Sequence, residues 1–177
     1  MKQIQLPFRQ KMVFLEGQQE VILDLEGSAR LRSQCQNVVS AGLAIEAVIN
    51  DILKKTVFRE NTEDINFLTN HILESSWCGF ADKRKLLFAV IERDNLLKGP
   101  EKSKLEKHLG KVTQWRNAFA HGEVEIHGSG VQLRYFEGSP RTIELDDDFW
   151  EKISVQFNDP FNLLMDLDAR IPSHART

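Results

Sequence analysis

The clearest pattern in the chain is a stripe of apolar and small residues that alternate four and three positions apart. This spacing places them on one face of a helix from about Ser28 to Thr56, with Ser28 as the expected N-cap. Gly42 within the stripe costs roughly 1 kcal/mol of helix propensity relative to alanine, so we expect another helix to approach closely there. Such stripes occur in helical bundles and in coiled-coil dimers. The stripe consists of Leu31, Cys35, Val38, Gly42, Ile45, Ile49 and Ile52.

Further helices are separated by residues that end helices. Lys98-Gly99-Pro100 forms a break, and Gly122 stands where a helix often turns into the left-handed region. The predicted helices are Phe8–Leu25, Asp64–Glu74, Ala81–Leu97 and Glu101–His121.

After Gly122 the period changes from that of a helix to that of a strand. Apolar residues alternate with polar ones at Val124 and Ile126, and again at Val131, Leu133 and Tyr135, which predicts a hairpin. A third strand is expected at residues 141–145, which completes a β meander of about residues 122–146. The last helix then starts after Asp146, with a break or kink at Pro160 and a disordered tail over residues 171–177. We therefore expect one mainly α domain of residues 1–177, a helical bundle with a small β meander inserted before the last helix.

Composition narrows the class of protein. Hydrophobic residues make up 41% and charged residues 28% of the chain, as in folded globular proteins. No apolar run approaches the roughly 20 residues of a membrane span, and the N-terminus lacks the features of a secretory signal, so we expect a cytoplasmic protein without a membrane partner.

Several chemistries can be set aside. Cys35 and Cys78 lie far apart with no cysteine or histidine cluster nearby, so we predict buried thiols rather than a zinc site. The adjacent Asp146, Asp147 and Asp148 indicate a helix start rather than a catalytic pair, and Gly128-Ser129-Gly130 indicates a turn rather than a phosphate loop. No metal and no cofactor are expected.

The charge distribution is uneven although the net charge is only −3. The segment from Lys98 to Arg116 contains six cations and two carboxylates, a local net charge of +4. Residues 137–151 carry a net charge of −5. One interpretation is an ordinary solvated helix face. The other is a phosphate-attracting surface in which Lys107 and Lys111 bind a nucleic-acid substrate.

The segment from Arg116 to Gly122 is the best candidate for a site. Asn117 and His121 are four residues apart and share a helix face, whereas Arg116 lies about 140° from His121 at about 100° per residue. A purely structural interpretation pairs Arg116 with an acid such as Glu46 and places His121 at the negative end of the helix dipole.

This segment, Arg116-Asn117-x-x-x-His121, resembles the R-x4-6-H motif of the HEPN superfamily. The surroundings are similar too, with Ala44-Ile45-Glu46 on an early long helix and Phe80-x-x-Lys83-x-x-Leu86-Leu87 on a later one. The resemblance spans roughly residues 28–168, except that the β meander is not part of the minimal family bundle. It implies a metal-independent endoribonuclease that works as a homodimer on RNA, as a toxin or in defence, with an antitoxin or regulatory protein as a further partner.

The resemblance also implies a role for each residue of the motif. His121 would transfer a proton at the ribose 2′-hydroxyl or the leaving oxygen, since the ordinary pKa of an imidazole lies near neutrality. Arg116 would hold the scissile phosphate, and Asn117 would orient the phosphate or the imidazole. The expected product is a 2′,3′-cyclic phosphate. The alternative is a non-catalytic HEPN dimer module that binds nucleotide, RNA or a protein partner.

Overall fold

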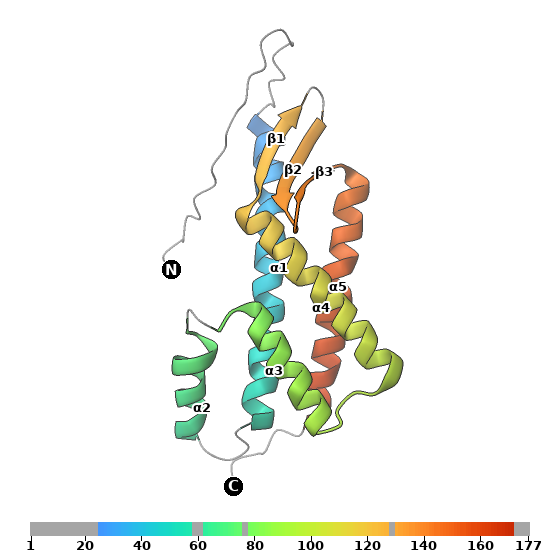
Figure 1. Cartoon of the computed structure of the whole chain (residues 1–177). Helices are drawn as coiled ribbons and strands as arrows, with labels where there is room; N and C mark the ends of the chain where they lie inside the picture. The colour runs from blue at the N-terminus through green and yellow to red at the C-terminus, as the bar shows by residue number, and fades with distance from the viewer. Residues whose placement is uncertain (1–24, 58–61, 76–77, 128–129, 172–177) are drawn as a thin grey trace. The chain divides into compact units, whose positions relative to one another are not determined.

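A computed structural model describes residues 25–57, 62–75, 78–127 and 130–171 (Figure 1). Over these residues the fold is mainly α, with a three-stranded antiparallel sheet before the last helix, which confirms the predicted fold class. The elements in chain order are α1 Leu25–Val57, α2 Thr62–Leu68, the π-helical segment η1 Thr69–Leu73, α3 Phe80–Arg93, α4 Gly99–His121, β1 Glu123–His127, β2 Gly130–Phe136, β3 Pro140–Glu144 and α5 Asp147–Arg170.

The chain divides into two compact units, and the helices α1, α4 and α5 contribute residues to both. The first unit consists of residues 1–39 and 114–153, and the second of residues 40–113 and 154–177. None of the helices in the described part of the chain is long and apolar enough to cross a lipid bilayer.

The second unit is built on a core of aliphatic side chains from four helices. Ile45, Ile49 and Ile52 of the predicted stripe are at most 1% exposed, which confirms that this face of α1 is buried. Helices α3, α4 and α5 add further core residues, including Leu87, Ile91, Leu105, Leu109, Leu164 and Leu167. Burying such side chains contributes roughly 1.5–3 kcal/mol each, so these residues dominate the stability of the unit.

A buried ion pair lies within this apolar core. Lys83 of α3 donates a hydrogen bond of 2.5 Å to Glu46 of α1, and the two side chains are only 5% and 14% exposed. A charge this deeply buried is tolerated because its partner is close and of opposite sign. The pair therefore holds α3 against α1 at a fixed register.

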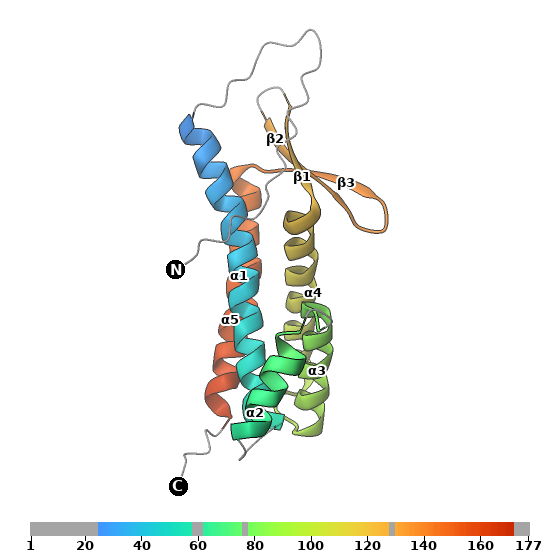
Figure 2. The ribbon, with the colours of Figure 1, turned by 90° about the vertical axis from the view of Figure 1, so that its left-hand side faces the viewer.

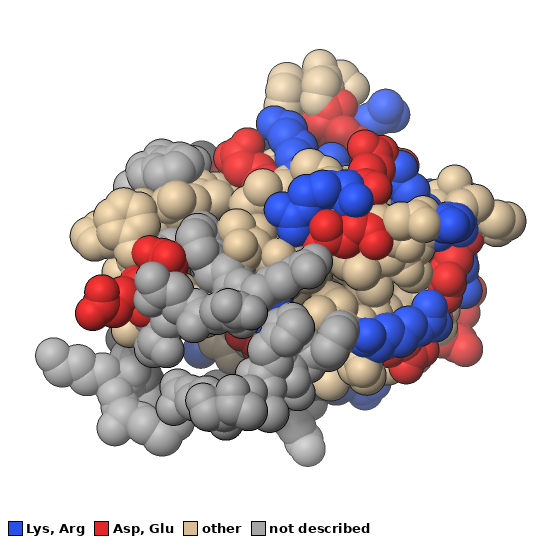
Figure 3. Space-filling view, turned by 90° about the horizontal axis from the view of Figure 1, so that it is seen from below, with Lys and Arg blue, Asp and Glu red and all other residues tan. Residues whose placement is uncertain are grey.

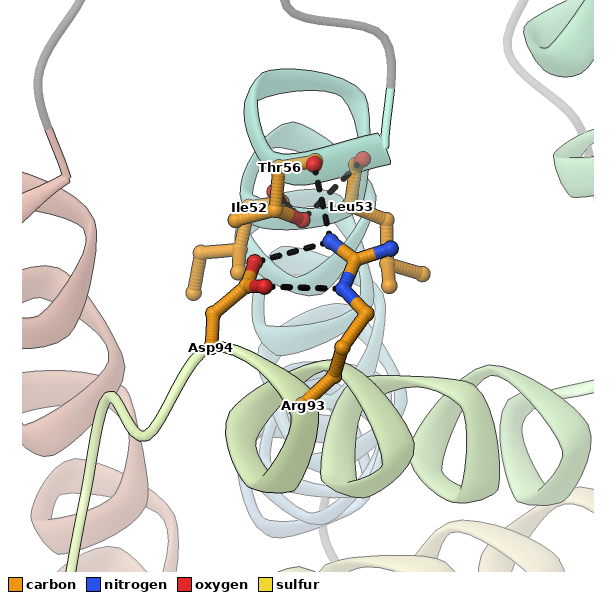
Figure 4. Close-up of polar contacts among 5 residues, drawn as sticks. All are labelled: Ile52, Leu53, Thr56, Arg93 and Asp94. Atoms are coloured by element: carbon orange, nitrogen blue, oxygen red, sulfur yellow. Dashed lines mark hydrogen bonds and ion pairs between the residues drawn. The ribbon is translucent and has the colours of Figure 1, made fainter.

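The C-terminal end of α1 is capped by a side chain from α3 (Figure 4). The guanidinium of Arg93 donates to the carbonyl oxygen of Thr56 at 3.0 Å and to both carboxylate oxygens of Asp94 at 2.8 Å. The hydroxyl of Thr56 donates back to the carbonyl of Ile52 at 2.8 Å. Helix ends leave carbonyl groups without intrahelical partners, so this contact satisfies one that would otherwise need water.

The first unit contains the sheet, whose strands follow one another in the order β1-β2-β3 directly after α4 (Figure 2). Residues 131, 133 and 135 of β2 face inward, and Leu133 is 1% exposed. The inner side of the unit is aromatic. Trp115 of α4 contacts the rings of Tyr135 and Phe149, and Phe119 of α4 contacts those of Phe149 and Trp150.

Several helices begin or end at other residues than the sequence predicts. The helix α1 begins at Leu25, so Ser28 lies inside it and is not its N-cap. The predicted helix Ala81–Leu97 ends at Arg93, because Asn95 adopts a left-handed conformation with φ of 54°. Asp146 does cap α5, since its carboxylate accepts from the backbone N–H of Phe149 at 2.7 Å.

The helix α5 continues through Pro160, so no break occurs there. Proline costs roughly 3 kcal/mol inside a helix. Pro160 is buried here, as are Phe157 and Leu164 of the same helix. Ile171 is also buried, and its N–H donates to the Asp168 carbonyl, so it does not belong to a disordered tail. The predicted helix Phe8–Leu25 lies outside the described residues except for Leu25, as does the tail beyond Ile171.

Candidate functional site

The end of α4 presents two polar side chains to solvent, and two of the three residues between them are buried. Asn117 and His121 are exposed, and so is Ala120, whereas Ala118 and Phe119 are at most 9% exposed. Arg116 is half-buried. The shared face of Asn117 and His121 is thus the outer face of the helix, and Arg116 lies toward its edge, as the helical spacing predicts.

The inner face of this helix end is anchored by aromatic side chains. The ring of Phe119 lies 5.9 Å from that of Trp150, and Trp115 meets Phe149 edge to face at 5.2 Å. Aromatic pairs at such distances contribute roughly 0.5–1.5 kcal/mol beyond the area that they bury. The helix that carries Arg116, Asn117 and His121 is therefore firmly held in its unit.

Gly122 ends the segment by close backbone contact rather than by an unusual conformation. Its φ is not in the left-handed region, which the glycines at 99 and 138 do occupy, so that prediction was wrong. Instead, a β-carbon on Gly122 would lie 2.3 Å from the Ala118 carbonyl oxygen and 2.9 Å from that of Arg134. The chain needs a glycine here because it passes straight from α4 into β1, next to β2.

The turn between β2 and β3 is tied to α4 one helical turn before Asn117. The side-chain amide of Gln114 donates to the carboxylate of Glu137 at 2.8 Å. No sequence pattern indicated this contact, since the two residues are 23 positions apart. Phe136, next to Glu137, is 75% exposed on the side of β2 opposite Leu133. The alternation along β2 could have indicated that position, because even-numbered residues face away from the core.

The predicted substrate-binding residues Lys107 and Lys111 are both exposed and lie on the part of α4 that belongs to the second unit. Part of the positive charge around them is offset, since Lys102 pairs with Glu92 at 2.5 Å. On the face shown in Figure 3, basic and acidic side chains of the described residues are interleaved. The pairing of Arg116 with Glu46 stays a prediction.

The surroundings of the candidate site within the first unit are acidic. Between Glu123 and Glu151 the chain carries eight carboxylates and two arginines, a net charge of −6. Arg134 already faces Glu125 at 3.7 Å, and Arg30 faces Asp147 at 3.7 Å. Exposed pairs of this kind contribute little to stability, but they reduce the attraction that these arginines can exert on a phosphate.

Metal and thiol chemistry find no support in the described part of the chain. No group of three or more histidine, cysteine, aspartate or glutamate side chains there could hold a metal ion. Cys35 and Cys78 are free and buried, as predicted. Burial raises the pKa of the Cys35 thiol to about 11 and also raises the pKa of the Cys78 thiol, so neither is a ready nucleophile.

The candidate site therefore consists of Arg116, Asn117 and His121 at the end of α4, with Gly122 fixing the exit of the chain. Comparison of the chain with protein-family models, with curated proteins and with solved structures finds no match.

Proposed function

We propose that this protein is a metal-independent endoribonuclease of the HEPN type that acts as a homodimer in the cytoplasm, as a toxin or in defence. The observation that carries the proposal is the exposure of Asn117 and His121 on one face of α4, above a buried aromatic anchor. A site on a rigid helix end can hold a substrate with little reorganisation. The two free thiols are in keeping with a reducing compartment.

The proposed reaction needs only side chains and the RNA itself. The 2′-oxygen of the ribose attacks the adjacent phosphorus, the bond to the 5′-oxygen breaks, and the products are a 2′,3′-cyclic phosphate and a 5′-hydroxyl. His121 accepts the proton of the 2′-hydroxyl or supplies one to the departing oxygen, and water carries out the other proton transfer. Arg116 stabilises the charge that grows on the phosphate, and Asn117 orients it.

Two protomers are needed because one helix does not bring Arg116 and His121 together. They lie about 140° apart on an ideal helix and differ in exposure, so the arginine of one copy would serve the histidine of another. This can be tested by mixing two inactive variants, Arg116→Gln and His121→Ala. A shared site restores part of the cleavage activity in mixed dimers, whereas a site within one protomer restores none.

We further propose that Lys107 and Lys111, on the same helix α4, bind the phosphates that flank the cleaved bond. RNA binding that uses them depends steeply on salt, because each phosphate contact releases counterions. Replacing both with alanine would weaken RNA binding and lower the salt dependence, with little change in stability, because both side chains are exposed. Unchanged RNA affinity and salt dependence would leave these lysines as an ordinary solvated face.

The second candidate function is a non-catalytic HEPN dimer that binds nucleotide, RNA or a protein partner. The net charge of −6 after the motif favours it, since carboxylates repel RNA phosphates. Purified protein incubated with RNA in EDTA separates the two candidates. Cleavage that His121→Ala abolishes supports the enzyme, and the absence of any cleavage supports the binding module.

A further inference from the structure

One face of the sheet in the first unit is largely exposed and has an aromatic residue at the end of β2. Cross-strand partners share a face, and three alternate pairs of β2 and β3 point away from the core: Gln132 with Glu144, Arg134 with Thr142, and Phe136 with Pro140. We call these six residues the Phe136 face. Phe136 is 75% exposed, the largest exposed fraction among the large hydrophobic residues in the described part of the chain.

An aromatic ring this exposed contributes little of the stabilising free energy that its burial would give. Full burial of a phenylalanine side chain is worth roughly 1.5–3 kcal/mol. Pro140 lies directly across from it and is also exposed, so the two form an apolar spot on an otherwise polar surface. Spots of this kind with a polar rim are typical of interaction sites.

The charge around the Phe136 face selects a protein over RNA as its partner. By register, Glu123 and Glu125 of β1 lie on the same side of the sheet as Glu144, so three carboxylates stand there against one arginine, that of Arg134. RNA phosphates are repelled by such a surface, although an exposed ring could stack on a base. Lysine and arginine side chains of a protein are attracted to it.

The edge of strand β3 could bind a partner through backbone hydrogen bonds. This strand stands at one end of the order β1-β2-β3, so among the described residues it has a strand on one side only. An extended segment can add to such an edge through backbone hydrogen bonds, while its alternate side chains contact the face. The segment that binds to β3 is then an extended one in which basic and apolar residues alternate.

We propose that the Phe136 face docks a protein partner that presents an extended segment of alternating basic and apolar residues, and that this partner regulates the site at Asn117 and His121. The regulatory role rests on the ribonuclease proposed above. Glu137 follows Phe136 and accepts from Gln114, which precedes Asn117 by three residues or about 4.5 Å along the helix. A partner seated on Phe136 therefore lies beside the turn that is hydrogen-bonded to α4 one helical turn before Asn117.

The test uses the full chain and two synthetic hexapeptides, one of alternating lysine and valine and one of alternating glutamate and valine. Amide NMR shifts measured during titration report where and how tightly each peptide binds. The lysine peptide is expected to saturate with shifts in β2 and β3. Phe136→Ser is expected to weaken it roughly tenfold, the factor that about 1.4 kcal/mol of lost burial gives. The control Val155→Ser, at a 53% exposed position on α5 in the second unit, leaves binding unchanged.

Every other outcome overturns the proposal. Three results would contradict a basic partner on the Phe136 face. The glutamate peptide binds with equal affinity, the lysine peptide does not bind, or Phe136→Ser has no effect on binding. If single-stranded RNA produces the Phe136-dependent shifts instead, the face belongs to RNA. If Phe136→Ser converts a dimer into monomers, the face belongs to a second copy. The titration involves no cleavage, so it tests the docking surface independently of the proposed ribonuclease. If the protein binds the peptide but cuts no RNA, the proposed ribonuclease is wrong and the proposed docking surface still holds.

Discussion

Gly122 lies so close to the backbone of Arg134 that a β-carbon on Gly122 would be 2.9 Å from the Arg134 carbonyl oxygen. The contact is between backbones, so neither side can move away at low cost. It places the residue that follows His121 directly against β2 and fixes where the end of α4 meets the sheet. The position of the exposed histidine is thus set by the sheet as well as by the helix.

Replacing Gly122 with alanine should therefore destabilise the protein by about 2 kcal/mol or more, because overpacking against rigid neighbours costs roughly 1–3 kcal/mol. Gly110 on the same helix provides a matched control. A β-carbon there would meet only the Arg84 guanidinium at 3.5 Å, so Gly110→Ala should stabilise the helix by up to about 1 kcal/mol. Urea denaturation of both variants measures the difference, and equal stabilities would contradict the close backbone contact.

Much of the fold could be predicted from the sequence because periodicity reports directly on burial. The four-three spacing of α1 matches the buried faces of Ile45, Ile49 and Ile52, and the alternation along β2 matches the buried Leu133. The positions that the sequence did not predict depend on contacts between distant residues. Gly122 is required by a strand that follows later in the chain, and Pro160 is buried within a helix that continues through it.

The candidate site was predictable only in part. Helical spacing gave the common exposed face of Asn117 and His121 and the different position of Arg116. It could not give the aromatic anchor beneath them, because Phe149 and Trp150 come from another helix. Nor could it show that Lys83 is the hydrogen-bond donor to Glu46, since that choice depends on how α3 packs against α1.

Removing the buried cation should be costly. Lys83→Met leaves the Glu46 carboxylate in a largely apolar environment without the ammonium that lies 2.5 Å away, and breaking a buried pair in this way costs roughly 3–5 kcal/mol. Lys85 on the same helix is 75% exposed and pairs with Asp82 at 3.3 Å. Lys85→Met should change the stability by less than about 1 kcal/mol. Thermal and urea unfolding of the two variants should therefore differ sharply, and similar unfolding curves would refute the buried pair.

The cap on α1 predicts a local effect. Arg93→Ala removes the donor to the Thr56 carbonyl, so the last turn of α1 should fray and the protein should lose about 1 kcal/mol of stability. Arg93→Lys should recover little of this, because lysine lacks the planar fork that also holds Asp94. Hydrogen exchange of the backbone amides of residues 53–57 measures the fraying. Protection equal to that of the wild type in Arg93→Ala would count against the cap.

The Cys35 thiol predicts a loss of stability at high pH. Its pKa is raised by burial from 9.0 to about 11, so between these values the unfolded chain releases a proton that the folded chain retains. The stability that the neutral, buried thiol contributes is thus fully present below pH 9 and disappears as the pH rises to about 11. In Cys35→Ala the free energy of unfolding should fall less over this range, whatever the cost of the smaller side chain at neutral pH. Parallel pH profiles of the two proteins would show that Cys35 does not titrate in this way.

The most direct test of the proposed function is cleavage of a single-stranded RNA by the purified protein in excess EDTA, with the fragment ends identified by mass spectrometry. We predict 2′,3′-cyclic phosphate ends for the wild type and no cleavage by a folded His121→Ala variant. A matched His108→Ala variant, altered in the second unit on the same helix, should retain activity. Equal cleavage by the wild type and His121→Ala, or no cleavage by the wild type, would contradict a catalytic role for the motif.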